Sequence, residues 1–458
     1  MALTTPEAGC RPPELDPAAV EQWRATGAPL VELLARVREL GGVAAFRLGA
    51  GPAARPTVLV TDPQAVQHVL AQHPDRYVKR SHRAKRLVGD SVLAVAGEPW
   101  KRQRKLLQAQ FTGPGMRRYE QRITAAAERT AAGWADHVRT GSTTDLGEDL
   151  RFFALDTIWR SLTGHQLDEA TYRELGAVDA LVAALPTLPP APERGAGVAA
   201  DPAGSPVPVD PAVAAVQAAV AADLARIDTV TRRAIEAARR GEVGPDGPGL
   251  LHVLLTGAAD RPEYTEQLIR DETVGLMMAG HETTARTLTW LYLLLAAHPE
   301  YQEWALSAGP AGSAERREAI QALVNEALRL YPSAWLMPRF AAVDDTVNGY
   351  RIDADTEILT SPYLTHRDPV LWPDPEVFDP TRFTVPGRRP MQAGAYYPFG
   401  IGARACLGLQ FAQREMAALL ELLLERFTPR LLAPAPQPVF GFIVRPDGAL
   451  PATIAARS

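Results

Sequence analysis

Apolar residues recur with helical spacing over most of the chain, whereas short strand-like runs are few. Val43–Leu48 and Thr57–Thr61 are predicted strands, and a hairpin is predicted around Asn348-Gly349 within Thr346–Ser361. Phe440–Arg445 predicts one further strand, and residues 365–398, rich in Pro and Asp, predict mostly irregular structure. The predicted helices cover Trp100–Phe111, Met116–Arg139, Asp149–Thr163, Ala212–Arg240, Glu263–Ala297, Arg316–Leu330 and Leu407–Glu425. The pattern therefore predicts a mainly α protein with a small β-rich region.

The segment Glu263–Ala297 predicts one helix of about 35 residues, roughly three times the usual length. It begins after Pro262 and ends before Pro299, both of which favour helix boundaries. Its centre carries polar residues in apolar surroundings, and polar groups in a helix that crosses a core cost free energy unless they are bonded. The centre is therefore a candidate site, although a kink or a polar patch would explain it as well.

Domain organisation follows less directly from the pattern. A length of 458 residues favours two or three domains. Residues 186–211 form a Pro-rich Ala/Gly stretch, which predicts either a linker between domains or a long loop between two helices.

Composition excludes several classes of protein. A formal net charge of -5 argues against a nucleic-acid binder. Two cysteines are too few for a disulfide framework, a multi-thiolate zinc site or an iron–sulphur cluster. No targeting signal and no stretch of about 18 uncharged apolar residues is found in the sequence, which predicts a cytoplasmic protein without a membrane span. Four of the 48 cationic residues are lysines, a bias that favours a GC-rich bacterial source.

One of the two cysteines lies in the segment Phe399–Gly408, which reads FGIGARACLG. A helix starting at about Leu407 would direct amide N–H groups and its positive end toward the sulphur of Cys406 and favour a thiolate. Gly402 and Gly408 are expected to let the backbone approach a flat, bulky group. A lone cysteine is usually buried and inert, but the pattern F-x-x-G-x-R-x-C-x-G fixes five positions and would occur by chance about once in ten thousand such chains.

This segment resembles the cysteine loop of the cytochrome P450 family, the haem-thiolate monooxygenases. The resemblance implies that Cys406 is the proximal iron ligand and that Arg404 contacts a haem propionate. It also implies that Phe399 and Gly400 pack near the ligand. A thiolate ligand of this kind favours O–O cleavage.

The centre of the long helix, Ala279–Thr284, reads AGHETT and resembles the oxygen-activation motif of the same family. The resemblance implies that Ala279 and Gly280 open a groove over the iron. Glu282 and Thr283 would then be the catalytic acid and hydroxyl that relay protons.

Three further signals occur in the order expected for the family. Glu326 and Arg329 share a helix face at i,i+3, and the resemblance implies that they join Arg382 in a structural network. Exposed pairs of this spacing are otherwise common and weak. The resemblance implies that Trp100 and Arg104 contact haem propionates. Arg339 is a further candidate for the same contact, and His82 is a lesser one. An exposed basic helix is the alternative for the first two.

The resemblance spans about residues 25–450. It implies a single cytochrome P450 domain over residues 1–458, with residues 1–24 as an N-terminal tail and residues 186–211 as a loop between two lid helices. The implied substrate wall consists of Leu93, Val95, residues 178–186 and 212–222, Met278, His281, Trp335, Leu336, Met337 and Phe442. Because most of these are apolar, a hydrophobic small molecule is the expected substrate.

The implied cofactor is haem b, with O2 as co-substrate and NAD(P)H as the indirect electron source. Electrons would come from a ferredoxin and its reductase, for which Lys101, Arg102, Lys105, Arg388 and Arg389 are the expected basic docking face; a solvated charged surface is the alternative. We expect a monomer that hydroxylates or otherwise oxidises C–H bonds of a bacterial secondary metabolite such as a terpenoid or polyketide. A peroxide-driven enzyme, an oxidative ring-forming or coupling enzyme and a non-enzymatic haem protein are the alternatives.

Overall fold

The computed structural model describes residues 9–48, 55–81, 84–176, 178, 181, 211–258, 261 and 264–457. The chain divides into two compact units built from segments that alternate along the sequence. Unit 1 comprises Met1–Lys79, Ala131–Gly147 and Arg286–Ser458, and unit 2 comprises Arg80–Thr130 and Glu148–Ala285. The prediction of one domain over the whole chain is not tested by this division.

Unit 1 contains all of the β-structure that is described. Its strands are β1 (Val43–Leu48), β2 (Arg55–Val60), β3 (Tyr77–Val78), β4 (Thr143–Asp145), β5 (Met337–Ala341), β6 (Asp345–Val347), β7 (Tyr350–Ile352), β8 (Glu357–Thr360), β9 (Phe427–Leu431), β10 (Pro438–Phe440), β11 (Val444–Pro446) and β12 (Pro451–Ala456). Its helices are α1 (Pro17–Thr26), α2 (Leu30–Glu39), α3 (Pro63–Gln67), α13 (Glu300–Ser307), α14 (Ala314–Leu330), α15 (Pro362–Thr365) and α16 (Leu409–Arg426), with a π-helix η2 (His68–Gln72) and 3-10 turns η4 (Pro380–Phe383) and η5 (Gly402–Arg404).

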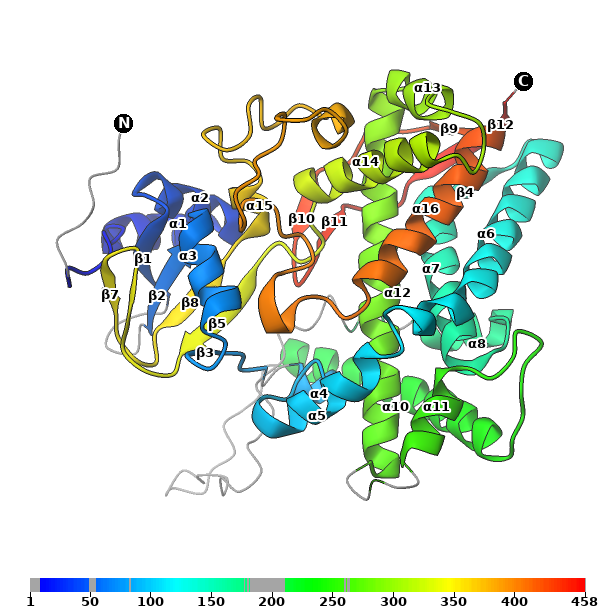
Figure 1. Ribbon diagram of the computed structural model, residues 1–458, viewed down its shortest axis with the longest axis horizontal. Coiled ribbons are helices and arrows are strands. Elements are labelled where there is room, and N and C mark those ends of the chain that lie inside the picture. The colour runs from blue at the N-terminus through cyan, green and yellow to red at the C-terminus, as the bar shows by residue number, and fades with distance from the viewer. Residues whose placement is uncertain are drawn as a thin grey trace. The chain divides into compact units, whose positions relative to one another are not determined.

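The largest sheet has the strand order β1-β2-β8-β5-β3. β2 and β8 are parallel, with Val58 opposite Ile358, and the other pairs are antiparallel. The buried side chains of β2 and β8 pack with Val66 of α3 and Leu70 of η2 in one apolar cluster. Figure 1 shows α1, α2 and α3 beside this sheet. Because the cluster joins η2 to the sheet, it fixes the element on which the cysteine loop rests.

Three smaller sheets complete unit 1, in the orders β4-β12-β9, β10-β11 and β6-β7. The predicted hairpin is confirmed, because Asn348 (φ 48°) and Gly349 (φ 84°) form the two-residue turn between β6 and β7. The single strand predicted over Phe440–Arg445 is wrong. The chain bends at Gly441, and β10 and β11 pair as two antiparallel strands with Phe440 opposite Val444.

Unit 2 is mainly helical, with its described helices joined by turns and loops. It contains α4 (Lys85–Val88), α5 (Gly97–Gln108), α8 (Glu169–Leu175), α10 (Pro211–Arg239) and α11 (Leu250–Ala258), and parts of α6 (Pro114–Thr140), α7 (Leu146–Thr163) and α12 (Glu266–Ala297), which continue into unit 1. The predicted long helix is confirmed as α12, the long helix labelled in Figure 1. It starts at Glu266, because the hydroxyl of Thr265 accepts the N–H of Leu268 at 3.2 Å and caps the first turn.

The described part of the predicted N-terminal tail, residues 9–24, contains a helix start and a contact with the sheet. Pro17 starts α1, and the side chain of Asp16 accepts the Ala18 N–H and caps it. The Leu15 N–H donates to the Ala45 carbonyl at 2.8 Å, which adds this segment to the edge of the sheet in unit 1. The predicted loop 186–211, apart from Pro211, lies outside the described residues, as does His82.

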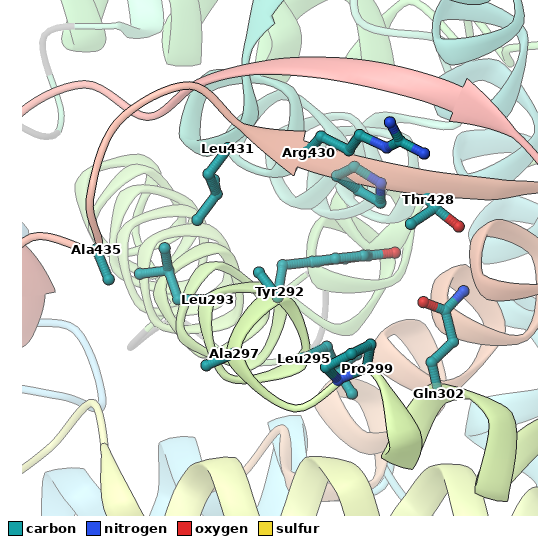
Figure 2. Close-up of a pocket in the computed structure, with 12 residues that line it drawn as sticks. Tyr292, Leu293, Leu295, Ala297, Pro299, Gln302, Thr428, Arg430, Leu431 and Ala435 are labelled. Atoms are coloured by element: carbon teal, nitrogen blue, oxygen red, sulfur yellow. The ribbon is translucent and has the colours of Figure 1, made fainter.

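A cavity of about 470 Å³ lies in unit 1 between the end of α12 and β9 (Figure 2). Its lining is mostly apolar, from Leu293, Leu295 and Leu431 among others. Tyr292 is buried there, and within the described residues its hydroxyl has no hydrogen-bond partner. None of the residues predicted as site residues lines this cavity, so it is distinct from the candidate site. Among the described residues, no helix is both long enough and apolar enough to cross a membrane.

Candidate functional site

The loop that carries Cys406 is held by its own backbone. The Cys406 N–H donates to the Phe399 carbonyl at 2.8 Å, and the Gly400 N–H donates to the Tyr397 carbonyl at 2.9 Å. Gly400 has a φ of 68°, which suits glycine at this turn. Cys406 is exposed, so its thiol can be reached by a group that approaches from outside the loop.

Gly402 is required by the protein itself. It has a φ of 74°, and a Cβ at this position would lie 2.3 Å from the Leu70 carbonyl oxygen and 2.5 Å from the Cα of Ala71 in η2. At Gly408 a Cβ would meet no atom within 4 Å. Gly402 therefore admits the backbone of η2, and the expectation that the glycines admit a flat group stays a prediction for Gly408.

The helix after the cysteine begins later than predicted. α16 starts at Leu409 with Gly408 as its cap, and the 3-10 turn Gly402–Arg404 precedes Cys406. Cys406 thus lies three residues before the first residue of the helix. Any effect of the α16 dipole on the thiol must therefore act across the residues between Cys406 and Leu409.

Three cationic side chains of unit 1 influence one another beside this loop: Lys79 after β3, Arg339 on β5 and Arg404 on η5. Burial, with the positive charges of Arg339 and Arg404, lowers the pKa of Lys79 to about 8. Burial lowers the pKa of Arg339 to about 10. The Nη1 of Arg339 donates to the Pro338 carbonyl at 2.8 Å, and no carboxylate among the described residues pairs with Arg339. Burial is thus the main cause of both shifts, and the charges of Arg339 and Arg404 add to it at Lys79.

Sequence reasoning missed Lys79. The signal was present, because only four lysines remain in a chain that otherwise uses arginine. The count alone does not separate Lys79 from the exposed Lys85, Lys101 and Lys105, because its burial and its neighbours are set by the fold.

Glu326 and Arg329 of α14 form a fully buried ion pair. Arg329 donates from Nε to Glu326 Oε2 at 2.7 Å and from Nη2 to Oε1 at 2.8 Å, and both side chains have zero exposure. Arg382 Nε lies 3.5 Å from Glu326 Oε1, and its other nitrogens donate to the carbonyls of Pro373 and Asp374. Burial raises the pKa of Glu326 in spite of these cations. The predicted trio is thus brought together, and exposed pairing is excluded.

The network of Glu326, Arg329 and Arg382, here called the brace, is linked to the cysteine loop through His366. Arg329 also donates to the carbonyls of His366 (3.0 Å), Pro375 (2.6 Å) and Val377 (3.0 Å). The Nε2 of His366 accepts the Tyr397 N–H at 3.0 Å, so this nitrogen carries no proton. Burial, together with the charges of Arg329 and Arg367, holds the pKa of His366 well below its usual range. A neutral histidine therefore ties the brace to the residue two before Phe399.

In unit 2, the centre of α12 presents two different faces. Ala279 is exposed, and Gly280 and Thr283 are half-buried, whereas His281, Glu282 and Thr284 are buried. The Thr283 hydroxyl donates to the Ala279 carbonyl at 2.9 Å, a contact on the exposed face. Adjacent positions on a helix point about 100° apart, so Glu282 does not share this face with Thr283.

Two residues of this motif have structural neighbours within unit 2. A Cβ on Gly280 would lie 3.1 Å from the Ile158 side chain of α7, so α12 packs closely against α7 at this position. His281 has zero exposure, and its Nδ1 bonds to the Met277 carbonyl at 2.9 Å. A position on an accessible substrate wall, as predicted for His281, does not fit this burial.

The remaining predicted residues lie as follows. In α5, Trp100 and Arg104 are half-buried one turn apart, as the i,i+4 spacing requires.

In unit 1, Trp335 is 3% exposed and its indole N–H donates to the Gly441 carbonyl at 2.8 Å, which fixes the turn that carries the exposed Phe442. Met337 lies against Gly400, and a Cβ there would be 3.6 Å from its sulphur. Leu93 and Leu336 are half-buried, and Val95 and Met278 are buried.

The predicted docking face is divided. Lys101, Arg102 and Lys105 are exposed on α5 in unit 2, and Arg388 and Arg389 belong to unit 1. Lys101 pairs with Glu98 at 2.8 Å and Arg388 pairs with Asp379 at 2.8 Å. Two of the five cations are therefore partly neutralised.

Comparison with known proteins agrees with these motifs. The family profile described as Cytochrome P450 matches residues 28–192 and 224–447. Two curated relatives come from Streptomyces melanosporofaciens. Cyclooctatin synthase is 28% identical over 93% of this chain and 93% of its own, and cyclooctat-9-en-7-ol 5-monooxygenase is 27% identical over 87% and 85%. The crystal structure of CYP175A1 from Thermus thermophillus superposes with a TM-score of 0.73 and 27% identity, over 97% of this chain and all of that one.

The chain therefore belongs to the cytochrome P450 family. The fold is that of P450 haem domains, mainly helical with a small β-region, as predicted. Members of the family are haem enzymes that use O2 and electrons from a partner, and this chain is a cytochrome P450 monooxygenase.

Replacing Arg329 by Ala should destabilise the protein strongly. The change leaves Glu326 buried without its main cation and leaves three backbone carbonyls unsatisfied. We expect a loss of about 3–5 kcal/mol in the free energy of unfolding. Arg173→Ala is the matched control, because it removes an exposed i,i+4 ion pair with Glu169 and should cost less than about 1 kcal/mol. Denaturant titration of both variants measures the difference, and equal losses would contradict the role of the brace.

Replacing Gly402 by Ala should displace the cysteine loop from η2. A Cβ there would overlap the Leu70 carbonyl and would occupy a left-handed backbone, at a combined cost of about 2–4 kcal/mol. Gly408→Ala should cost less than about 1 kcal/mol, because its Cβ meets open space. Thermal unfolding followed by circular dichroism compares the two, and a neutral Gly402→Ala variant would show that η2 does not support the loop.

Proposed function

We propose that this protein is a haem b monooxygenase that oxidises a hydrophobic small molecule, of the terpenoid or polyketide kind, with O2 and electrons from a separate ferredoxin and its reductase. The observation that carries the proposal is the exposed Cys406 thiol on a backbone-locked loop beside the cations Lys79, Arg339 and Arg404. When bound, the haem supplies the activation of dioxygen, and the thiolate supplies electron density that favours O–O cleavage.

The donor set fits a haem. Cys406 would ligate the iron, and Gly400 and Phe399 would set the height of its sulphur through the turn and the Phe399 carbonyl contact. Two propionates need cationic or N–H donors, and Lys79, Arg339 and Arg404 supply them from unit 1. Trp100 and Arg104 supply an indole N–H and a guanidinium from one face of α5. An anion among these groups would favour the charged form of Lys79, whose pKa is lowered by burial and by the charges of Arg339 and Arg404.

Thr283 and Glu282 are the residues proposed to handle protons. Thr283 holds its hydroxyl hydrogen toward the Ala279 carbonyl, and a hydroxyl oxygen that donates in this way can also accept a hydrogen bond. Glu282 would supply protons to this pair from the buried side of α12, and the transfer would need water or a rotation, since the two side chains do not share a face.

The substrate class rests on the lining and on the relatives. Leu93, Val95, Met278, Leu336 and Phe442, which the family resemblance places toward the substrate, are all apolar, and apolar substrate-binding residues favour a ligand without many polar groups. One relative is named for oxidation of cyclooctat-9-en-7-ol. The electron donor is proposed to be an acidic ferredoxin reduced at the expense of NAD(P)H, and it would approach the exposed cations of α5.

The reduced carbon monoxide complex tests the ligand. The wild-type protein and Cys10→Ser should give the long-wavelength thiolate spectrum, whereas Cys406→Ser should lose it together with nearly all activity. Cys10 is the matched control because its contact with the sheet is made by its backbone carbonyl, which accepts the Arg351 N–H at 2.8 Å. A wild-type spectrum at the position of a histidine-ligated haem would overturn the proposed function.

Thr283→Ala tests the proton path. The fraction of electrons recovered in product should fall by about tenfold or more, with the balance released as reduced oxygen species, because general acid catalysis is lost. Thr284→Ser, at the adjacent buried position, should retain coupling. Unchanged coupling in Thr283→Ala would remove Thr283 from the mechanism and leave the haem-thiolate proposal standing.

A further inference from the structure

Two adjacent carboxylates of α12 hold the loop Gly89–Val95, which joins α4 to α5. The Asp90 N–H donates to Asp271 Oδ2 at 2.9 Å, and the Val92 N–H donates to Glu272 Oε2 at 3.1 Å. From the other side, Gln103 of α5 donates to the Asp90 carbonyl at 3.0 Å. All of these residues belong to unit 2. Nearby amides of one loop are thus bound to consecutive residues of one helix.

Two glycines allow the loop to approach α12 this closely. Gly89 has a φ of 55°, and a Cβ there would overlap the carboxyl group of Asp271. A Cβ on Gly275, one turn further along α12, would lie 2.8 Å from Ser91 Oγ. Beyond Ser91 the chain turns back on itself, since the N–H groups of Ala94 and Val95 both donate to the Ser91 carbonyl. The attachment at Asp90–Val92 therefore sets the positions of Leu93 and Val95.

The carboxylate of Asp271 is also held by side chains outside the loop. Gln267 donates to it at 2.9 Å and Arg270 donates to it at 3.0 Å. Arg270 also donates to Asp228 of α10 at 2.7 Å. One network thus joins α10, α12 and the loop, and the loop amides meet an acceptor that is already oriented.

Burying the ionisable carboxyl group of Glu272 costs free energy. It has zero exposure, and within the part of the chain that the structure describes its Oε1 has no hydrogen-bond partner. Burial, with a contribution from the charge of Asp271, raises the pKa of Glu272 to about 8. A glutamine would accept the same Val92 N–H without a titratable group. A buried acid kept where an amide would suffice indicates a role beyond stability.

We propose that Asp271 and Glu272 are positioning residues that clamp the loop Gly89–Val95 to α12 and thereby fix the substrate-facing side chains Leu93 and Val95. The placement of Leu93 and Val95 in the substrate pocket rests on the proposed function, whereas the clamp itself rests on the contacts above. Neither carboxylate touches the reacting atoms, so both act through the loop.

The clamp weakens as the pH rises from about 4.5 to about 8. In the closed state Glu272 holds its proton up to about pH 8, and in an opened, hydrated loop its pKa returns to about 4.5. Between these values the open state binds fewer protons, so opening becomes easier by up to about tenfold per pH unit and then levels off. The charged groups around it are Asp271 and Arg270 on α12, Asp228 on α10, and Asp90, which pairs with Lys85.

Hydrogen exchange of the loop in the holoenzyme tests the clamp. Glu272→Met removes the acceptor of the Val92 N–H and should speed exchange of the peptide covering residues 89–95 by about tenfold. Glu272→Gln should keep wild-type protection at pH 6 and should lose the added pH dependence, once intrinsic exchange rates are corrected. Thr273→Val is the matched control, because it removes a buried hydrogen bond to Ile269 that does not involve the loop.

Two ligands of different size test the effect on the pocket. Imidazole reaches the iron without needing much of the pocket wall, whereas 4-phenylimidazole also contacts the wall. Glu272→Met should weaken 4-phenylimidazole binding by about fivefold or more and leave imidazole within about twofold, measured by difference spectra. Thr273→Val should leave both unchanged.

The outcomes separate the two proposals. Wild-type exchange rates in Glu272→Met, or an unchanged pH dependence in Glu272→Gln, would overturn the clamp. Faster exchange with unchanged binding of 4-phenylimidazole would overturn the positioning of Leu93 and Val95. If Glu272→Met does not fold, the pH dependence of Glu272→Gln decides the clamp alone. A wild-type protein that binds neither imidazole nor 4-phenylimidazole would contradict the proposed function. The exchange result would still test the clamp in that case.

Discussion

The buried ion pair between Glu326 and Arg329 is the interaction on which the long irregular segment before the cysteine depends. Residues 366–377 form no regular helix or sheet that would satisfy their carbonyls. The guanidinium of Arg329 donates to three of these carbonyls while it neutralises Glu326. The cost of desolvating both charges is offset only because every strong donor of Arg329 is used. If this cation is removed, a carboxylate and three carbonyls lose their partner together. The pair is therefore part of the support of the cysteine loop, although it lies far from it in the sequence.

The charges of unit 1 are arranged in two opposite ways. The brace satisfies a buried acid completely, with cations and an N–H from Asp379 on the same carboxylate. Beside the cysteine loop, Lys79 and Arg339 are cations whose pKa values are depressed. Burial is the main cause of the shift at Lys79 and the cause of the shift at Arg339. The same protein thus contains a fully buried glutamate–arginine pair that satisfies its charges and, beside its cysteine, buried cations whose charged forms are disfavoured by desolvation.

How much the sequence predicted depends on whether a residue's role is local or set by the fold. The period of α12 and the Asn348-Gly349 turn follow from neighbours in the chain, and both predictions are confirmed. The trio Glu326, Arg329 and Arg382 was found because its spacing matches a family pattern. Lys79, Gly402 and the pair Asp271 and Glu272 owe their roles to partners about 180 to 330 residues away, which no local pattern records. The hairpin within Phe440–Arg445 was missed because apolar residues on both sides of the Gly441 bend read as one run.

The contact of Gly402 with η2 makes an early part of the chain a support of the cysteine loop. A π-helical turn holds one more residue than an α-helical turn of the same height, so a deletion within His68–Gln72 would tighten the turn and withdraw the surface on which the cysteine loop lies. Engineering that treats this turn as a remote, tolerant surface would in effect be moving the cysteine loop. For the same reason, exchanging loops between relatives of this chain requires that η2 and the cysteine loop be transferred together.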